Sequence, residues 1–164
     1  MNKILSILVR NHPGVLSHVA GLFTRRGYNI ESIAAGETAD PKITRITIVT
    51  SGDEVVIEQV IKQIRKLIDV IKVQELKYED AITRELLLLT IYVSMERRPE
   101  IITVANTFGA TVSDIADKTM TLEFGGNNLK INNIVKALGG FKIKELARTG
   151  LVALPLESNL EQKK

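Results

Sequence analysis

Cysteine and tryptophan are absent from this chain of 164 residues, and aromatic residues make up only 4% of it. Without cysteine there is no disulfide framework, no thiolate zinc site and no cysteine nucleophile. The few aromatic residues form no stacking motif of the kind that binds single-stranded RNA. No apolar run is long enough to span a bilayer, and no basic leader precedes the first apolar stretch. We therefore expect a cytoplasmic protein that does not bind membranes.

An excess of one charge is also missing. The net charge is +3, and the 22 basic residues are scattered among 19 acidic ones instead of forming one block. This pattern disfavours nucleic-acid binding and leaves RNA recognition as a weak alternative. The hydrophobic fraction of 45% is enough for a packed core, and the length fits one domain or two small ones.

Catalytic motifs are scarce as well. The only two histidines, His12 and His18, belong to no metal-binding or general-base motif and are expected in a turn and on the surface. Glycine pairs such as Gly139-Gly140 lack the spacing and the lysine of a phosphate-binding loop. Asp114 and Asp117 stand near a predicted turn, where solvent exposure is the better interpretation. We expect no catalytic residue and no metal site, although an enzyme acting alone stays open.

The first half of the chain alternates strand and helix signals. A β-branched run over 4–9 ends at Pro13-Gly14, where a helix begins whose apolar stripe stops before Gly27. Two strand-like segments over 29–38 and 43–50 then predict a hairpin. Asp53 is a suitable cap for a second helix, and 70–76 forms the last strand. The order is βαββαβ.

The second half repeats this order. Strands are predicted over 85–93, 112–116, 120–124 and 141–147, the last with a continuation past Gly150 left open. Pro99 and Gly109 suit the start and the end of one helix, and another lies near 129–138. The sequence thus predicts an α+β protein of two tandem ferredoxin-like units, 1–77 and 84–164, joined by a linker over 78–83. Exposed sheet faces and edges predict at least a dimer.

The turn at Asn11 and Gly14 is the candidate binding site. Amides in the first turn of a helix lack partners inside the helix, and with the helix dipole they attract a carboxylate. Gly14 lets a ligand approach the backbone, while the Asn11 carboxamide offers a donor and an acceptor. The alternative is that Asn11 is only a helix cap or a turn former.

These residues also resemble a known family. The motifs Asn11-x-Pro13-Gly14-Val15-Leu16 and Gly27-Tyr28-Asn29-Ile30-Glu31-Ser32 closely resemble the N-terminal ACT domain of the small, regulatory subunits of acetohydroxyacid synthase, also called acetolactate synthase. Further similarity lies in 46–48, 59–67, 69–70 and 145–150, so it covers nearly the whole chain. A bare Pro-Gly-x-Leu would indicate only an ACT domain, whereas the second motif within a two-unit chain is more specific.

The resemblance implies a non-catalytic subunit in branched-chain amino acid biosynthesis. Such a subunit binds and activates a catalytic subunit that uses thiamine diphosphate, Mg and FAD, and it confers feedback inhibition by valine. It implies no cofactor in this chain and a homodimer of ACT domains with the effector at their interface. The residues expected there are Asn11, Gly14, Val15 and Leu16 from one protomer, with Asn29 and Ile30 from the other. A stand-alone ACT-type amino-acid sensor with another partner is the alternative.

Overall fold

The computed structural model describes residues 2–161, and the chain divides into two compact units. Unit 1 consists of the residues up to Ile82 together with the segment from Leu151 onwards, and unit 2 is Thr83–Gly150. The segment from Leu151 onwards, which the sequence prediction places in the C-terminal unit of 84–164, thus clusters with unit 1. The predicted linker range, 78–83, contains a short 3-10 helix, η1 (Tyr78–Asp80), and the start of the next strand.

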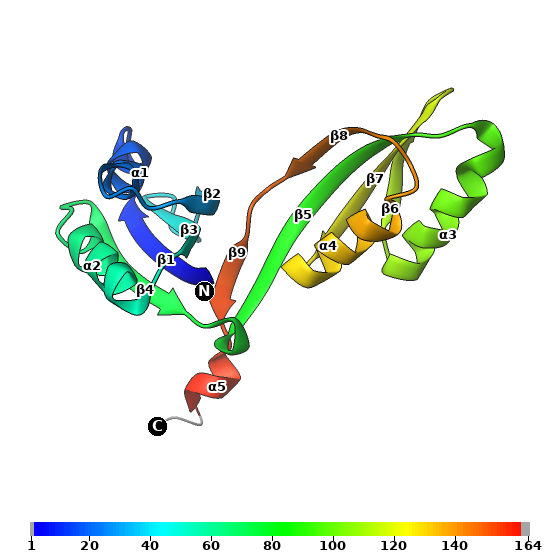
Figure 1. Cartoon of the computed structure of the whole chain (residues 1–164). Helices are drawn as coiled ribbons and strands as arrows, with labels where there is room; N and C mark the ends of the chain where they lie inside the picture. Colours follow the sequence, from blue (N-terminus) through cyan, green and yellow to red (C-terminus); the bar gives the residue numbers. More distant parts are fainter. Residues whose placement is uncertain (1, 162–164) are drawn as a thin grey trace. The chain divides into compact units, whose positions relative to one another are not determined.

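Unit 1 has a four-stranded antiparallel sheet with both long helices on one face (Figure 1). The strands lie in the order β2-β3-β1-β4, which leaves β2 and β4 at the two edges. The predicted βαββαβ order is confirmed. Its elements are β1 (Asn2–Arg10), α1 (Val15–Arg25), β2 (Ile30–Glu37), β3 (Ile43–Ser51), α2 (Glu54–Ile64) and β4 (Val70–Leu76).

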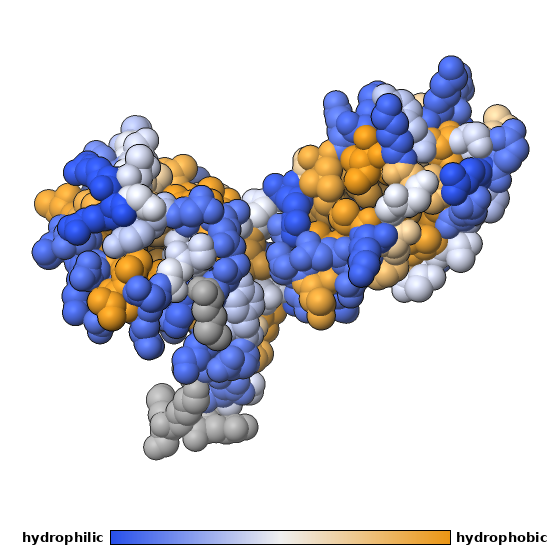
Figure 2. Space-filling view, in the orientation of Figure 1, coloured by the Kyte–Doolittle hydropathy of each residue, from blue (hydrophilic) through white to orange (hydrophobic). Residues whose placement is uncertain are grey.

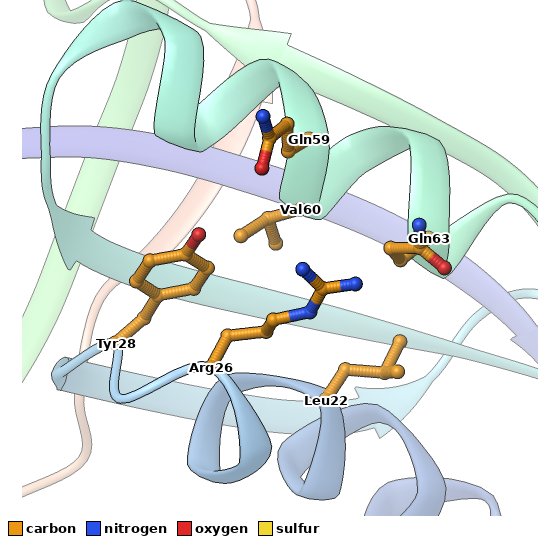
Figure 3. Close-up of a pocket in the computed structure, with 6 residues that line it drawn as sticks. All are labelled: Leu22, Arg26, Tyr28, Gln59, Val60 and Gln63. Atoms are coloured by element: carbon orange, nitrogen blue, oxygen red, sulfur yellow. The ribbon is translucent and has the colours of Figure 1, made fainter.

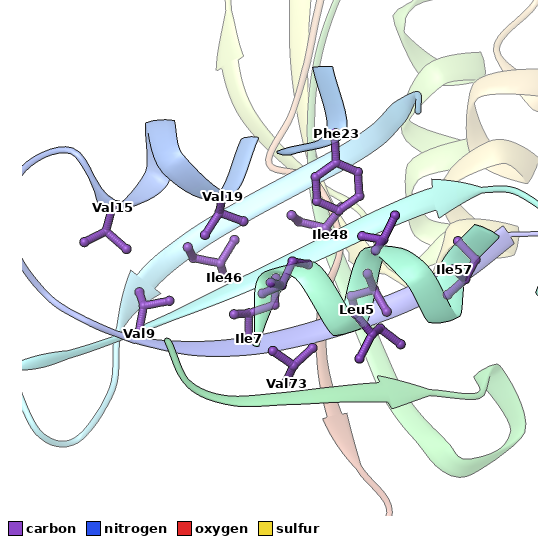
Figure 4. Close-up of a cluster of buried hydrophobic side chains, with 13 residues drawn as sticks. Leu5, Ile7, Val9, Val15, Val19, Phe23, Ile46, Ile48, Ile57 and Val73 are labelled. Atoms are coloured by element: carbon purple, nitrogen blue, oxygen red, sulfur yellow. The ribbon is translucent and has the colours of Figure 1, made fainter. Parts of the chain in front are cut away.

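The core of unit 1 lies between this sheet and the two helices. In Figure 4, Val15, Val19 and Phe23 point from α1 toward strand residues such as Ile46 and Ile48. The apolar stripes read from the sequence therefore face the sheet. The predicted cap of α2 is also confirmed, because the Val56 N–H donates to Asp53 Oδ1 at 2.8 Å.

The other face of this sheet is partly covered by the returning C-terminal segment. This segment contains β9 (Val152–Pro155) and α5 (Glu157–Glu161). Leu151 and Ala153 are buried there in an apolar cluster with Ile4 and Val49. The N–H of Leu151 also donates to Ser32 Oγ on β2.

Unit 2 repeats the same topology, with the antiparallel strand order β6-β7-β5-β8. Pro99 lies in the first turn of α3 and Gly109 ends that helix, as predicted, with a φ of 72° in the left-handed region. Its elements are β5 (Ala81–Tyr92), the 3-10 helix η2 (Met95–Arg97), α3 (Arg98–Phe108), β6 (Thr111–Ile115), β7 (Thr119–Gly126), α4 (Asn128–Ala137) and β8 (Ile143–Arg148).

The strand β5 has one buried and one exposed side. Leu87, Leu89 and Ile91 are fully buried in the core of unit 2. Between them, Leu86 and Leu88 remain partly accessible, with exposed fractions of 37% and 42%. Apolar side chains also reach the surface of both units elsewhere (Figure 2). In the described part of the chain, no helix is long and apolar enough to cross a membrane.

Candidate functional site

The turn that joins β1 to α1 is fastened to the β2–β3 turn by Asn11. The Asn11 main-chain N–H donates to the Lys42 carbonyl at 2.8 Å, and its Nδ2 donates to the Pro41 carbonyl at 2.9 Å. A longer contact of 3.4 Å joins Nδ2 to Glu37 Oε1 at the end of β2. The Asn11 side chain does not cap α1, so the helix-cap alternative was wrong. Its Oδ1 accepts no hydrogen bond from any described residue.

Gly14 begins the helix in a backbone conformation that suits glycine. Its φ of 89° lies in the left-handed region, and no side chain caps the helix. The first amide of the turn with a helical partner is that of His18, which donates to the Gly14 carbonyl at 3.0 Å. The amides of Val15, Leu16 and Ser17 precede it, and none has a partner among residues 2–161.

The surroundings of these amides favour an anion. No acidic residue lies in the first turn of α1, so nothing on the helix neutralises the positive end of its dipole. A Cβ placed on Gly14 would meet no atom within 4 Å, so the space beside this backbone is open. A small carboxylate can therefore approach the amides directly.

Two apolar residues of this turn have different positions. Leu16 is 46% exposed, whereas Val15 is only 3% exposed and packs in the core of unit 1 (Figure 4). The Val15 side chain is already buried there, so a ligand at this turn would contact the main-chain amide of Val15 and not its side chain.

Asn29 and Ile30 lie at the start of β2, away from this turn. The Asn29 side chain is exposed, and its carbonyl accepts a hydrogen bond of 2.7 Å from Thr50 Oγ1. Asn11 contacts Glu37 at the opposite end of β2, eight residues of strand away. At the usual rise per residue, that strand is about 25 Å long. One protomer therefore does not bring Asn11 and Asn29 together.

His12 is a titratable neighbour of this turn, and its contact with Asp69 was not predicted from the sequence. Its Nε2 lies 2.6 Å from Asp69 Oδ1, and its Nδ1 lies 3.2 Å from the Pro13 carbonyl oxygen. The hydrogen bond with Asp69, followed by the one with Pro13, raises the pKa of the His12 imidazole above its ordinary value. The partner is 57 residues away in the sequence, so no local pattern indicates it.

A small hollow between α1 and α2 is too small for an amino acid. Figure 3 shows Arg26 and Tyr28 extending from the end of α1 and the following turn toward Val60 on α2. The remaining space is about 10 Å³, which is about enough for one water molecule.

Acidic side chains are also potential metal ligands. The described residues contain no group of three histidine or acidic side chains able to hold a metal ion. Asp114 and Asp117 are exposed, as their place near a turn predicted. The geometry thus favours ligand binding at the β1–α1 turn.

Comparison with known proteins agrees with this fold over both units. Residues 5–72 match the family described as AHAS small subunit-like ACT domain, and residues 84–157 match the family described as small subunit of acetolactate synthase.

Similar proteins extend over nearly the whole chain. A probable acetolactate synthase small subunit from Methanothermobacter thermautotrophicus is 47% identical, over 92% of this chain and 90% of that protein. The small subunit from Aquifex aeolicus is 42% identical over 97% of this chain and 83% of its own length. The crystal structure of the Thermotoga maritima small subunit is 35% identical, with a TM-score of 0.88 over 94% of this chain and 97% of that one. The chain therefore belongs to the acetolactate synthase small-subunit family, and its N-terminal unit is an ACT domain.

Proposed function

We propose that this chain is the non-catalytic regulatory subunit of a cytoplasmic acetolactate synthase. In this role it binds and activates a catalytic subunit and makes that subunit sensitive to valine. The observation that carries the proposal is the open, uncapped first turn of α1 in an ACT domain of this family. Similarity over both units supports a regulatory subunit more strongly than a stand-alone sensor.

The effector site is proposed to span two protomers. β2 is an edge strand, so its outer backbone groups are available to a second copy. A two-fold axis makes the two β2 strands antiparallel, which sets the start of one strand beside the end of the other. Asn29 and Ile30 of one protomer then approach the Asn11–Gly14 turn of its partner. This pairing explains why the predicted site residues lie at opposite ends of β2 in one chain.

Each part of valine has a matching group in such a site. The carboxylate accepts hydrogen bonds from the amides of Val15 and Leu16. The ammonium donates to the Asn11 Oδ1, which has no other partner among the described residues. The branched side chain packs on Leu16, which is half exposed, and on Ile30 of the other protomer.

Inhibition follows from where the ligand binds. A ligand held by two protomers stabilises the arrangement in which both halves of its site are in place. It can shift the complex only by the difference between its affinities for the two arrangements. The catalytic subunit is inhibited because its activating partner changes arrangement.

The direct test is acetolactate formation from pyruvate by the same organism's catalytic subunit. The rate is measured for that subunit alone, with this chain, and with this chain plus valine. Stimulation that valine reverses supports both parts of the proposal. Stimulation that valine leaves unchanged keeps the activator role and refutes the effector assignment. No binding and no change in rate favour the sensor alternative.

Asn29→Ala tests the binding site itself. We propose that the exposed Asn29 carboxamide of the other protomer hydrogen-bonds a charged group of valine. Its loss is expected to weaken valine inhibition by about tenfold or more, while activation is kept. Asn106→Ala is a matched control, since Asn106 is exposed on α3 of unit 2. Unchanged valine sensitivity in Asn29→Ala would count against this site.

Gly14→Asp tests the carboxylate contact. The new side chain fills the open space and places a negative charge beside the helix amides. We expect a folded variant that no longer responds to valine. Normal valine affinity in that variant would refute the proposed position of the carboxylate.

A further inference from the structure

His12 ties the candidate effector turn to a second part of unit 1. While Asn11 binds the β2–β3 turn, the His12 ring contacts Asp69 at the start of β4. A main-chain hydrogen bond of 2.9 Å, from the Arg10 N–H to the Asp69 carbonyl, supports the same connection. The Pro13–Gly14 turn is thus held from both sides, and only the link through His12 involves a group that titrates near neutral pH.

The geometry of the ring matches its charged form. Both ring nitrogens face oxygen acceptors: Nε2 faces the Asp69 carboxylate and Nδ1 faces the Pro13 carbonyl. Neutral imidazole carries one N–H and can satisfy only one of them, whereas imidazolium donates to both. Asp69 is held in place, because its side chain is only 13% exposed. The neutral ring would therefore leave one nitrogen lone pair against an oxygen.

The charged groups around this ring come from few elements. Asp69 favours the imidazolium, and Arg10 at the end of β1 opposes it. The first turn of α1 contributes no acidic side chain, and the β2–β3 turn beside Asn11 carries Asp40 and Lys42. Asp69 has the closest contact and the strongest effect. The pKa of His12 is accordingly raised, in the direction that the hydrogen-bond geometry requires.

We propose that His12, as an imidazolium, is a positioning residue of the effector site, which holds the Pro13–Gly14 turn on Asp69 and adds positive charge beside the α1 amides. This inference rests on the proposed function. It adds a specific property: affinity for an amino-acid carboxylate falls as the pH rises through the His12 titration. A charge near a helix terminus changes affinity by about two- to fivefold.

The test measures valine binding to the full-length chain by calorimetry between about pH 6 and about pH 9. The wild-type affinity should fall by about two- to fivefold across this range. His12→Gln should bind at the weaker, high-pH level throughout. His18→Gln is the matched control, because His18 is an exposed histidine in the first turn of α1 and makes no side-chain hydrogen bond with a described residue. It should keep the wild-type profile.

A second variant separates positioning from general structural damage. Asp69→Asn removes the carboxylate that favours the imidazolium. The pH at which valine affinity falls should therefore be lower in this variant, while binding at low pH persists. Proton resonances of the His12 ring follow the same titration without ligand. Binding with the same pH profile in wild type and His12→Gln would overturn this inference alone. No valine binding by the wild type at any pH would overturn the proposed effector site and this inference with it.

Discussion

The main-chain N–H of Leu151 donates a 2.8 Å hydrogen bond to the hydroxyl oxygen of Ser32, across 119 residues of sequence. Ser32 lies on β2, the edge strand proposed to contribute to the effector site. Leu151 begins the segment that returns to unit 1 after Gly150, whose φ of 83° breaks the preceding strand. A direct hydrogen bond therefore joins β2 to the segment that follows β8 in the chain.

Ser32→Ala tests this contact. The variant leaves the Leu151 amide without its acceptor in a partly buried place, which should lower the free energy of unfolding by about 1–3 kcal/mol. Urea unfolding of the full chain measures the change. Ser32→Thr keeps a hydroxyl and should lose much less. Equal stabilities of wild type and Ser32→Ala would show that the hydrogen bond does not hold the segment.

Substitution of Gly14 and of Gly21 by alanine tests whether the backbone at Gly14 is strained for other residues. A Cβ has open space at both positions, but only Gly14 has a positive φ. Gly14→Ala should therefore destabilise the chain by about 1 kcal/mol, because an L-residue is strained there. Gly21→Ala, inside α1, should stabilise it by about 0.5–1 kcal/mol. Thermal unfolding measures the change in stability of each variant. Stabilisation by both substitutions would contradict the left-handed conformation at the start of α1.

The ion pair of Glu85 and Arg148 should stabilise unit 2. Arg148 Nε and Nη2 donate to the two Glu85 oxygens at 2.8 and 2.7 Å, and the Glu85 side chain is only 5% exposed. Arg148→Ala leaves a buried carboxylate without its partner, which should cost about 3 kcal/mol.

Lys62→Ala removes an exposed pair on α2 and is the control for Arg148→Ala, with an expected cost of about 0.5 kcal/mol or less. Guanidinium unfolding compares the two variants. A similar small effect of both would mean that Arg148 is not needed to hold Glu85.

His12 should also make stability depend on pH. Its pKa is raised in the folded chain, so its contribution is fully present below the unfolded value of about 6.5 and is lost as the pH rises through the folded value. The difference in unfolding free energy between wild type and His12→Gln should therefore shrink with rising pH. Urea titrations at several pH values measure it, and a constant or growing difference would show that the ring is not held as an imidazolium.

Local signals in the sequence predicted most of the fold. Asp53, Pro99 and Gly109 mark helix ends because they act within one turn of the chain, and each is found in its expected role. The continuation past Gly150, which the sequence left open, is the strand β9, but its packing on the back of the unit 1 sheet was not predicted because it depends on a distant part of the chain. A short apolar segment carries no information about which sheet it will cover.

Local signals in the sequence also predicted part of the candidate site. Gly14 stands at the start of a helix, as its place after a strand and a proline indicated. The burial of the Val15 side chain agrees with its place in the apolar stripe predicted for this helix. The contact of His12 with Asp69 joins distant segments, so only the folded chain brings them together.

The most direct test of the shared effector site uses Asn11→Ala and Asn29→Ala chains mixed in equal amounts. In a mixed dimer, one site carries both substitutions and the other carries neither. Random exchange makes about half of the dimers mixed, so about a quarter of the wild-type valine sites should return at wild-type affinity. Neither variant alone should bind with that affinity. A mixture that binds valine no better than the separate variants would contradict a site built from Asn11 of one protomer and Asn29 of its partner.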